Sequence, residues 1–169
     1  MADERRDAQA RILRSLERQS RLQREIALGV AREHGISRAS LSIVRLLDQL
    51  GEAGVGDLAQ ALRVDLSVAS RQLSELVSEG IVERTVDDVD RRARSLRLTA
   101  AGRTIADGIR AVMHSRVAEA FGAWTPGELA EAATTLERIV EATARAAGCP
   151  GIHPAAHARA HEPVAAATR

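Results

Sequence analysis

Apolar side chains recur every three to four positions through most of the chain, which is the period of a helix with one buried face. This period predicts a long helix over residues 5–33, a helix over 40–50, and two short helices over 55–62 and 66–78. It returns in two further helices over 99–121 and 126–147. Residues 51–54 are rich in glycine and carry no period, so they are expected to form a loop.

Between residues 81 and 98 the helical period gives way to alternation, which is typical of a half-buried strand. Residues 81–86 and 94–98 are therefore predicted to be strands, joined by a polar turn over 87–92. The whole pattern predicts a mainly α fold (α+β) with a small β-hairpin wing. Its architecture is a winged helix-turn-helix plus a layer of helices that supports dimerisation.

The short helices over 55–62 and 66–78 have the pattern of a helix-turn-helix. The first turns Leu58, Ala59 and Leu62 inward, and Asp65 is placed to cap the second. Hydroxyl groups and an arginine are left on the outer face of the second helix, and both suit contacts with DNA phosphates and base edges. A solvated helix face is the alternative. The second helix is expected to bury Leu66, Ala69, Leu73 and Leu76, and to expose Ser67, Ser70, Arg71, Gln72 and Ser74.

The predicted hairpin carries a cluster of arginines with no acid among them. Five arginines lie between residues 91 and 103, whereas the net charge of the whole chain is only +1, so any attraction for DNA must be local. Arg91, Arg92 and Arg94 are predicted to contact DNA. Asp90 stands two residues before Arg92 and can hold its guanidinium in one orientation. An arginine held at a hairpin tip suits the narrow, electronegative minor groove.

Other classes of protein find less support in the composition. Only 1% of residues are aromatic, which argues against binders that stack single-stranded bases. No phosphate loop, nucleophile elbow or metallohydrolase motif occurs, so neither an enzyme nor a bound cofactor is expected. No apolar run could span a bilayer and no signal-peptide pattern is present, so a cytoplasmic protein without membrane contact is expected.

The hairpin and the residues after it resemble a known signature. Asp90, Arg92, Leu98, Thr99 and Gly102 match the pattern of the multiple-antibiotic-resistance regulator (MarR) family of winged-helix transcription factors. This resemblance implies a homodimer that binds a pseudo-palindromic operator in double-stranded DNA, with the helix at 66–79 in the major groove and the hairpin in the flanking minor groove. It also implies a repressor that a small aromatic or apolar effector releases from DNA. Arg63 is a departure, because glycine is more usual in this turn; it could add a phosphate contact.

The chain is accordingly divided into three regions. Residues 5–50 and 99–147 are predicted to form the helical dimerisation region, and residues 51–98 the DNA-binding region. Residues 148–169 are rich in alanine, histidine and proline without a period, so they are interpreted as a mobile tail. His114 lies within the helix over 99–121, where a solvated or dimer-packing role is favoured over lining a ligand pocket.

Two alternatives to this function remain open. Cysteine and histidine recur every four residues in the tail, which is a pattern for a metal-responsive regulator, although prolines interrupt any helix there. Biased composition is the simpler interpretation of that pattern. The second alternative is a winged helix that binds other proteins and not DNA. The candidate metal ligands of the first alternative are Cys149, His153, His157 and His161.

Overall fold

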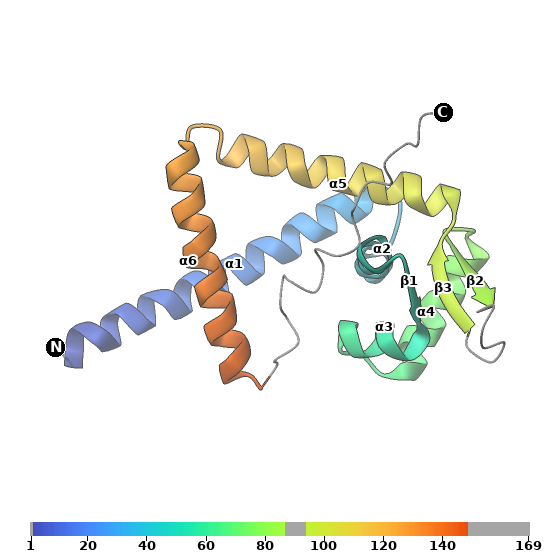
Figure 1. The fold of residues 1–169 in the computed structure, drawn as a ribbon, viewed down its shortest axis with the longest axis horizontal. Helices are drawn as coiled ribbons and strands as arrows, with labels where there is room; N and C mark the ends of the chain where they lie inside the picture. Colours follow the sequence, from blue (N-terminus) through green and yellow to red (C-terminus); the bar gives the residue numbers. More distant parts are fainter. Residues whose placement is uncertain (1, 87–93, 149–169) are drawn as a thin grey trace, which may run out of the picture.

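The computed structural model describes residues 2–86 and 94–148, and Figure 1 shows a helical protein with one small sheet. This confirms the predicted fold class. In chain order the elements are α1 (Ala2–Glu33), α2 (Arg38–Leu50), β1 (Glu52–Gly54), α3 (Val55–Leu62), α4 (Leu66–Ser78), β2 (Val82–Val86), β3 (Arg94–Leu98), α5 (Ala100–Ala120) and α6 (Pro126–Ala146).

Three of the helices, α2, α5 and α6, begin where a hydroxyl oxygen accepts from a free amide of the first turn. α2 starts two residues earlier than predicted because Ser37 caps it, accepting a hydrogen bond from the Ser40 N–H at 3.0 Å. α6 begins with the capping box that its sequence contains. The Thr125 N–H donates to the Glu128 carboxylate at 2.8 Å, and the Glu128 N–H donates to the Thr125 hydroxyl oxygen at 3.3 Å.

The sheet contains a strand that the sequence pattern did not predict. Its order is β1-β3-β2, and both pairs are antiparallel. Residues 52–54 were expected to be a loop, and that prediction is wrong, because they pair with Ser95–Arg97 of β3. Three residues are too few to show alternation, and their hydrogen-bond partners lie far along the chain, so no local signal marks this strand.

The core lies where α2, α3, α4 and the sheet meet the end of α1 and the start of α5. Its largest fully buried side chains come from all of these elements. Leu66 was predicted to be buried, but it is 60% exposed, since it opens the first turn of α4 at the edge of the core. The buried set includes Val30, Ile43, Val44, Leu47, Leu58, Leu73, Leu76, Val82, Leu96 and Ile109.

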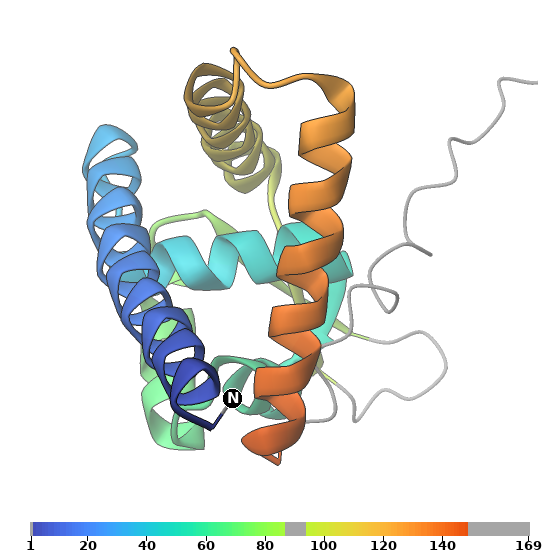
Figure 2. The same cartoon turned by 90° about the vertical axis from the view of Figure 1, so that its left-hand side faces the viewer.

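The remaining helical segments extend away from this core. Figures 1 and 2 show the first half of α1, the far end of α5 and the whole of α6 projecting from one side. None of the described elements packs extensively against α6, and α6 has no buried residue. Large apolar side chains are consequently exposed on these segments and beside them: Ile12, Leu13, Leu22, Val117, Phe121, Trp124, Leu129, Leu136 and Val140.

Candidate nucleic-acid interface

The turn between α3 and α4 has the geometry of a helix-turn-helix. Leu58, Ala59 and Leu73 are buried where the two helices pack together, as predicted. α3 ends on Arg63, whose backbone is left-handed (φ 55°, ψ 46°), and the following Val64 N–H donates to the Ala59 carbonyl at 3.1 Å. Helices commonly end in this way on a glycine, and here the same turn forms with an arginine at that position.

Asp65 occupies the cap position of α4, but its side chain does not act as predicted. Its backbone is extended, and no hydrogen bond from α4 to its carboxylate occurs in the described structure. The Asp65 carbonyl accepts instead from the N–H groups of Val68 and Ala69, both at 3.0 Å. The expectation of a side-chain cap was therefore wrong, although the helix begins at the predicted residue.

The outer face of α4 carries the predicted polar side chains. Ser67, Ser70, Arg71 and Ser74 are exposed and Gln72 is half-buried, because the apolar positions of the same helix face the core. The Ser74 hydroxyl donates to the Ser70 carbonyl at 2.8 Å, which leaves its lone pairs available as acceptors. Arg71 forms no ion pair with any described residue, so its guanidinium is available to a partner outside the chain.

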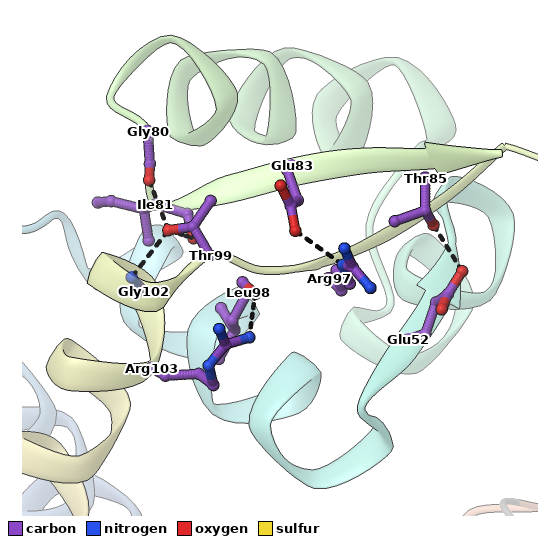
Figure 3. Close-up of polar contacts among 10 residues, drawn as sticks. All are labelled: Glu52, Gly80, Ile81, Glu83, Thr85, Arg97, Leu98, Thr99, Gly102 and Arg103. Atoms are coloured by element: carbon purple, nitrogen blue, oxygen red, sulfur yellow. Dashed lines mark hydrogen bonds and ion pairs between the residues drawn. The ribbon is translucent and has the colours of Figure 1, made fainter.

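The strands β2 and β3 form the hairpin, and two of its polar contacts appear in Figure 3. Arg97 lies directly opposite Glu83, and its Nε donates to Glu83 Oε1 at 2.7 Å. The Thr85 hydroxyl donates to Glu52 on β1 at 2.6 Å, across the intervening strand. Arg97 is thus neutralised within the sheet, which explains why the arginines nearer the tip are better candidates for DNA contact.

The tip of the hairpin lies outside the described residues, and with it Asp90, Arg91 and Arg92. The backbone of Arg94 opens β3 opposite Val86, and its side chain is likewise outside the description. The structure therefore places the two strands that lead to the tip, while the predicted contacts of the tip stay predictions.

A compact set of hydrogen bonds fixes the base of the hairpin to α5 (Figure 3). The Thr99 hydroxyl donates to the Gly80 carbonyl at 2.6 Å and accepts from the Gly102 N–H at 3.1 Å. The Thr99 N–H donates to the Ile81 carbonyl at 3.0 Å, and Arg103 Nη1 donates to the Leu98 carbonyl at 2.9 Å. These bonds hold the hairpin at a set position relative to α5.

Gly102 is part of this junction for a steric reason. A Cβ atom at this position would overlap the Ile81 carbonyl oxygen and would stand only 3.3 Å from the Leu98 Cβ. From the sequence, Leu98 and Gly102 were known only as parts of a family signature, whereas Thr99 stood in the cap position of the following helix, and it does cap α5. In the structure Leu98, Thr99 and Gly102 form the base of the hairpin, whereas Asp90 and Arg92 lie outside the described residues.

A cleft lies between α2 and α5, beside the core. Its volume is about 310 Å³, and Arg45, Ile109, Met113 and His114 are among its lining residues. Arg110 bridges its two helices by donating to both carboxylate oxygens of Asp48, at 2.6 and 2.7 Å. This hydrogen bonding, followed by the negative charge of Asp48, raises the pKa of Arg110 above its ordinary value. His114, for which pocket lining was the less favoured role, does border this cleft.

Two further expectations concern metals and membranes. The described residues contain no group of three or more histidine, cysteine or acidic side chains able to hold a metal ion. The four candidate ligands of the tail lie outside those residues, so the structure does not test them. None of the helices in the described part of the chain is long and apolar enough to cross a membrane.

The order of the elements, the helix-turn-helix and the hairpin together define a winged helix. Comparisons with known proteins show which family it resembles. A sequence model of the MarR family matches residues 36–93, from the start of α2 to the hairpin tip. The solved structure of wild-type apo MarR from E. coli superposes with a TM-score of 0.63 at 22% identity, covering 75% of this chain and 93% of that one. Over these residues the chain is similar to the MarR family.

Other relatives agree with this assignment. The chain is 26% identical over 111 residues to YxaD of Bacillus subtilis (strain 168), an uncharacterised HTH-type transcriptional regulator, and the match spans 66% of this chain and 78% of YxaD. It is also similar to a mutant E. coli MarR solved in complex with operator DNA, with a TM-score of 0.59 and 23% identity, over 75% of this chain and 91% of that one. The predicted resemblance to the MarR family is confirmed over residues 36–93.

Proposed function

We propose that this protein is a homodimeric repressor of the MarR family that binds a pseudo-palindromic operator in double-stranded DNA. The observation that carries the proposal is the exposed polar face of α4, presented by a helix-turn-helix next to an arginine-rich hairpin. In this arrangement α4 enters the major groove and the hairpin the adjacent minor groove. The proposed contact residues are Ser67, Ser70, Arg71, Gln72 and Ser74 on α4 and Arg91, Arg92 and Arg94 on the hairpin, with Asp90 orienting the tip.

The proposed dimer is supported by the apolar side chains that this chain leaves uncovered. On α6, Leu129, Leu136 and Val140 lie on one face at helical spacing and are 38–57% exposed. Exposed apolar side chains also occur on the first half of α1 and at the end of α5. Large apolar side chains left uncovered in this way are typical of an interface, and a second copy of the chain would supply a matching set. Residues 5–50 and 99–147 are the proposed dimerisation region, and 51–98 the DNA-binding region.

This arrangement has consequences for the DNA target. A symmetric dimer places its two α4 helices on half-sites about one helical turn apart, which is the reason for a pseudo-palindromic operator. The affinity should depend steeply on salt, because the arginines displace counterions from the phosphates. Since the target is chromosomal DNA and the named relatives with this fold are bacterial, the cytoplasm is the proposed location.

A small effector is proposed to enter the cleft between α2 and α5. Ile109 and Met113 offer an apolar wall and Arg45 a cation, which together suit a small aromatic acid. α5 begins at the base of the hairpin, so a ligand that moves α5 against α2 can change the position of the wing. Benzoate is a suitable probe: it should raise the Tm of the wild-type protein and weaken its DNA binding, and Arg45→Ala should abolish both effects. No effect of benzoate and related acids would count against this cleft.

The central experiment is a titration of the full-length protein into fluorescent DNA from the region upstream of its own gene. Arg71→Ala and Arg92→Ala are expected to weaken binding at least tenfold, while Arg138→Ala on α6 serves as the control and binds like the wild type. Wild-type affinity in both test variants would contradict the proposed interface. A folded dimer that binds neither this DNA nor random DNA would favour the protein-interaction alternative.

A further inference from the structure

Arg63 is the one residue other than glycine with a positive φ in the described structure. Its φ of 55° and ψ of 46° lie in the left-handed region, where the Cβ of an L-residue comes too close to the following carbonyl and which glycine enters without that penalty. The helix-turn-helix therefore has an arginine where the backbone favours glycine, and the fold is less stable for it.

No contact within the described part of the chain compensates for this conformation. The Arg63 side chain is exposed and forms no hydrogen bond or ion pair with a described residue, including the neighbouring Asp65. The bonds that close the turn are made by the backbone alone. The Arg63 N–H donates to Gln60 and the Val64 N–H to Ala59, and a glycine would make both equally well. A strained residue without a structural role is an indication of function.

We propose that Arg63 binds a phosphate of the DNA backbone at the edge of the groove entered by α4. The inference rests on the proposed function, because it needs DNA on the outer face of α4. Arg63 lies three residues before the first residue of α4. A recognition helix contacts base edges with its N-terminal residues, so the turn before it lies where the groove meets the phosphates.

The chemistry of the side chain fits this ligand. A guanidinium donates two parallel hydrogen bonds to a phosphate, and it keeps its charge at any physiological pH. The nearest residues on the α4 face, Ser67 and Ser70, are uncharged hydroxyls that suit the same backbone. Asp65 is the one acid beside Arg63 in the turn, and its carboxylate makes no bond to α4. Because a phosphate contact reads no base, it should strengthen binding to every sequence alike.

The test compares Arg63→Gly, Arg63→Lys and Arg71→Ala with the wild-type protein, on operator DNA and on a random duplex of equal length. Arg63→Gly relieves the strained turn, so its Tm should rise by about 2–4 °C. Its affinity should nevertheless fall about tenfold on both DNAs, so that the ratio between them is unchanged. The slope of log affinity against log salt should flatten by about 0.9 for each half-site occupied. Arg63→Lys retains a charge and should recover most of the affinity.

The design separates failure of this inference from failure of the proposed function. If Arg63→Gly keeps the affinity and salt slope of the wild type while Arg71→Ala loses preference for the operator, Arg63 is no phosphate ligand and the proposed interface stands. If Arg63→Gly lowers the operator-to-random ratio, Arg63 reads bases and the inference is wrong in that respect. A wild-type protein that binds neither duplex overturns the proposed function and this inference with it.

Discussion

Replacement of Gly102 by alanine tests how the hairpin is held. The new Cβ would overlap the Ile81 carbonyl oxygen, whereas ordinary contacts between a carbon and a carbonyl oxygen begin at about 3.3 Å. It would also stand 3.1 Å from the Ile81 carbonyl carbon. The main obstacle is the Ile81 backbone, which cannot move aside as the end of a flexible side chain could. We expect the first turn of α5 and the start of the hairpin to separate.

The size of the effect can be worked from the bonds at the junction. Separation disrupts the hydrogen bond from the Thr99 N–H to Ile81, at 3.0 Å, and that from the Thr99 hydroxyl to Gly80, at 2.6 Å. Two such bonds and the helix cap together contribute about 3 kcal/mol. Alanine is favoured over glycine within a helix by about 1 kcal/mol, which acts in the opposite direction. The expected net loss in the free energy of unfolding is therefore about 2 kcal/mol.

Urea denaturation followed by circular dichroism measures this loss, and Gly127→Ala is a matched control. Gly127 also lies in the first turn of a helix capped by threonine, but nothing stands within 4 Å of the position that its new methyl group would take. The control should be as stable as the wild type or slightly more so. If Gly102→Ala unfolds at the same urea concentration as Gly127→Ala, the steric argument is refuted.

Three further changes test other parts of the structure. Glu83→Gln should free Arg97 from its 2.7 Å ion pair, so the affinity for DNA should rise and depend more steeply on salt in the titration. The free energy of unfolding should fall by less than about 1 kcal/mol. Leu136→Glu should convert the proposed dimer to a monomer in sedimentation and weaken operator binding, because it places a charge in the exposed apolar face of α6. The hydrogen bond from the Thr125 N–H, followed by that from its hydroxyl, lowers the pKa of Glu128. The ionised Glu128 carboxylate therefore stabilises α6 fully above the pKa of the unfolded chain, which is about 4.3, and this stabilisation is lost as the pH falls through the lower pKa of the folded protein. The difference in stability between the wild type and Glu128→Gln should close below about pH 4.

The elements that the sequence predicted well are those whose stability is decided locally. The six helices and the two strands of the hairpin carry their own period and, in the case of α6, their own capping box. The outer face of α4 was also predictable, because burying Ala69, Leu73 and Leu76 leaves only one side for Ser70 and Arg71. The resemblance to the MarR family followed from a spacing of residues that could be read directly.

The features that the sequence did not reveal depend on residues distant in the chain. β1 exists because β3 offers it an edge, and neither segment shows that alone. The requirement for Gly102 arises from the approach of Ile81, and the engagement of Arg97 from a glutamate on the other strand. The side-chain cap expected at Asp65 failed although the residue type was favourable, since a backbone carbonyl accepts the bonds there. Features of this kind can be recognised only in the packed structure.

The family signature therefore combines two physical roles that a binding assay alone would confuse. Arg92 is proposed to touch DNA and Asp90 to orient it, whereas Thr99 and Gly102 fix the base of the hairpin to α5. Substitution in either group should weaken operator binding. A loss caused at the base must be accompanied by a fall in the free energy of unfolding, while a loss caused at the tip must leave stability unchanged. Only residues of the second kind can be assigned as DNA ligands, and this applies equally to Arg63, for which stability and affinity should move in opposite directions.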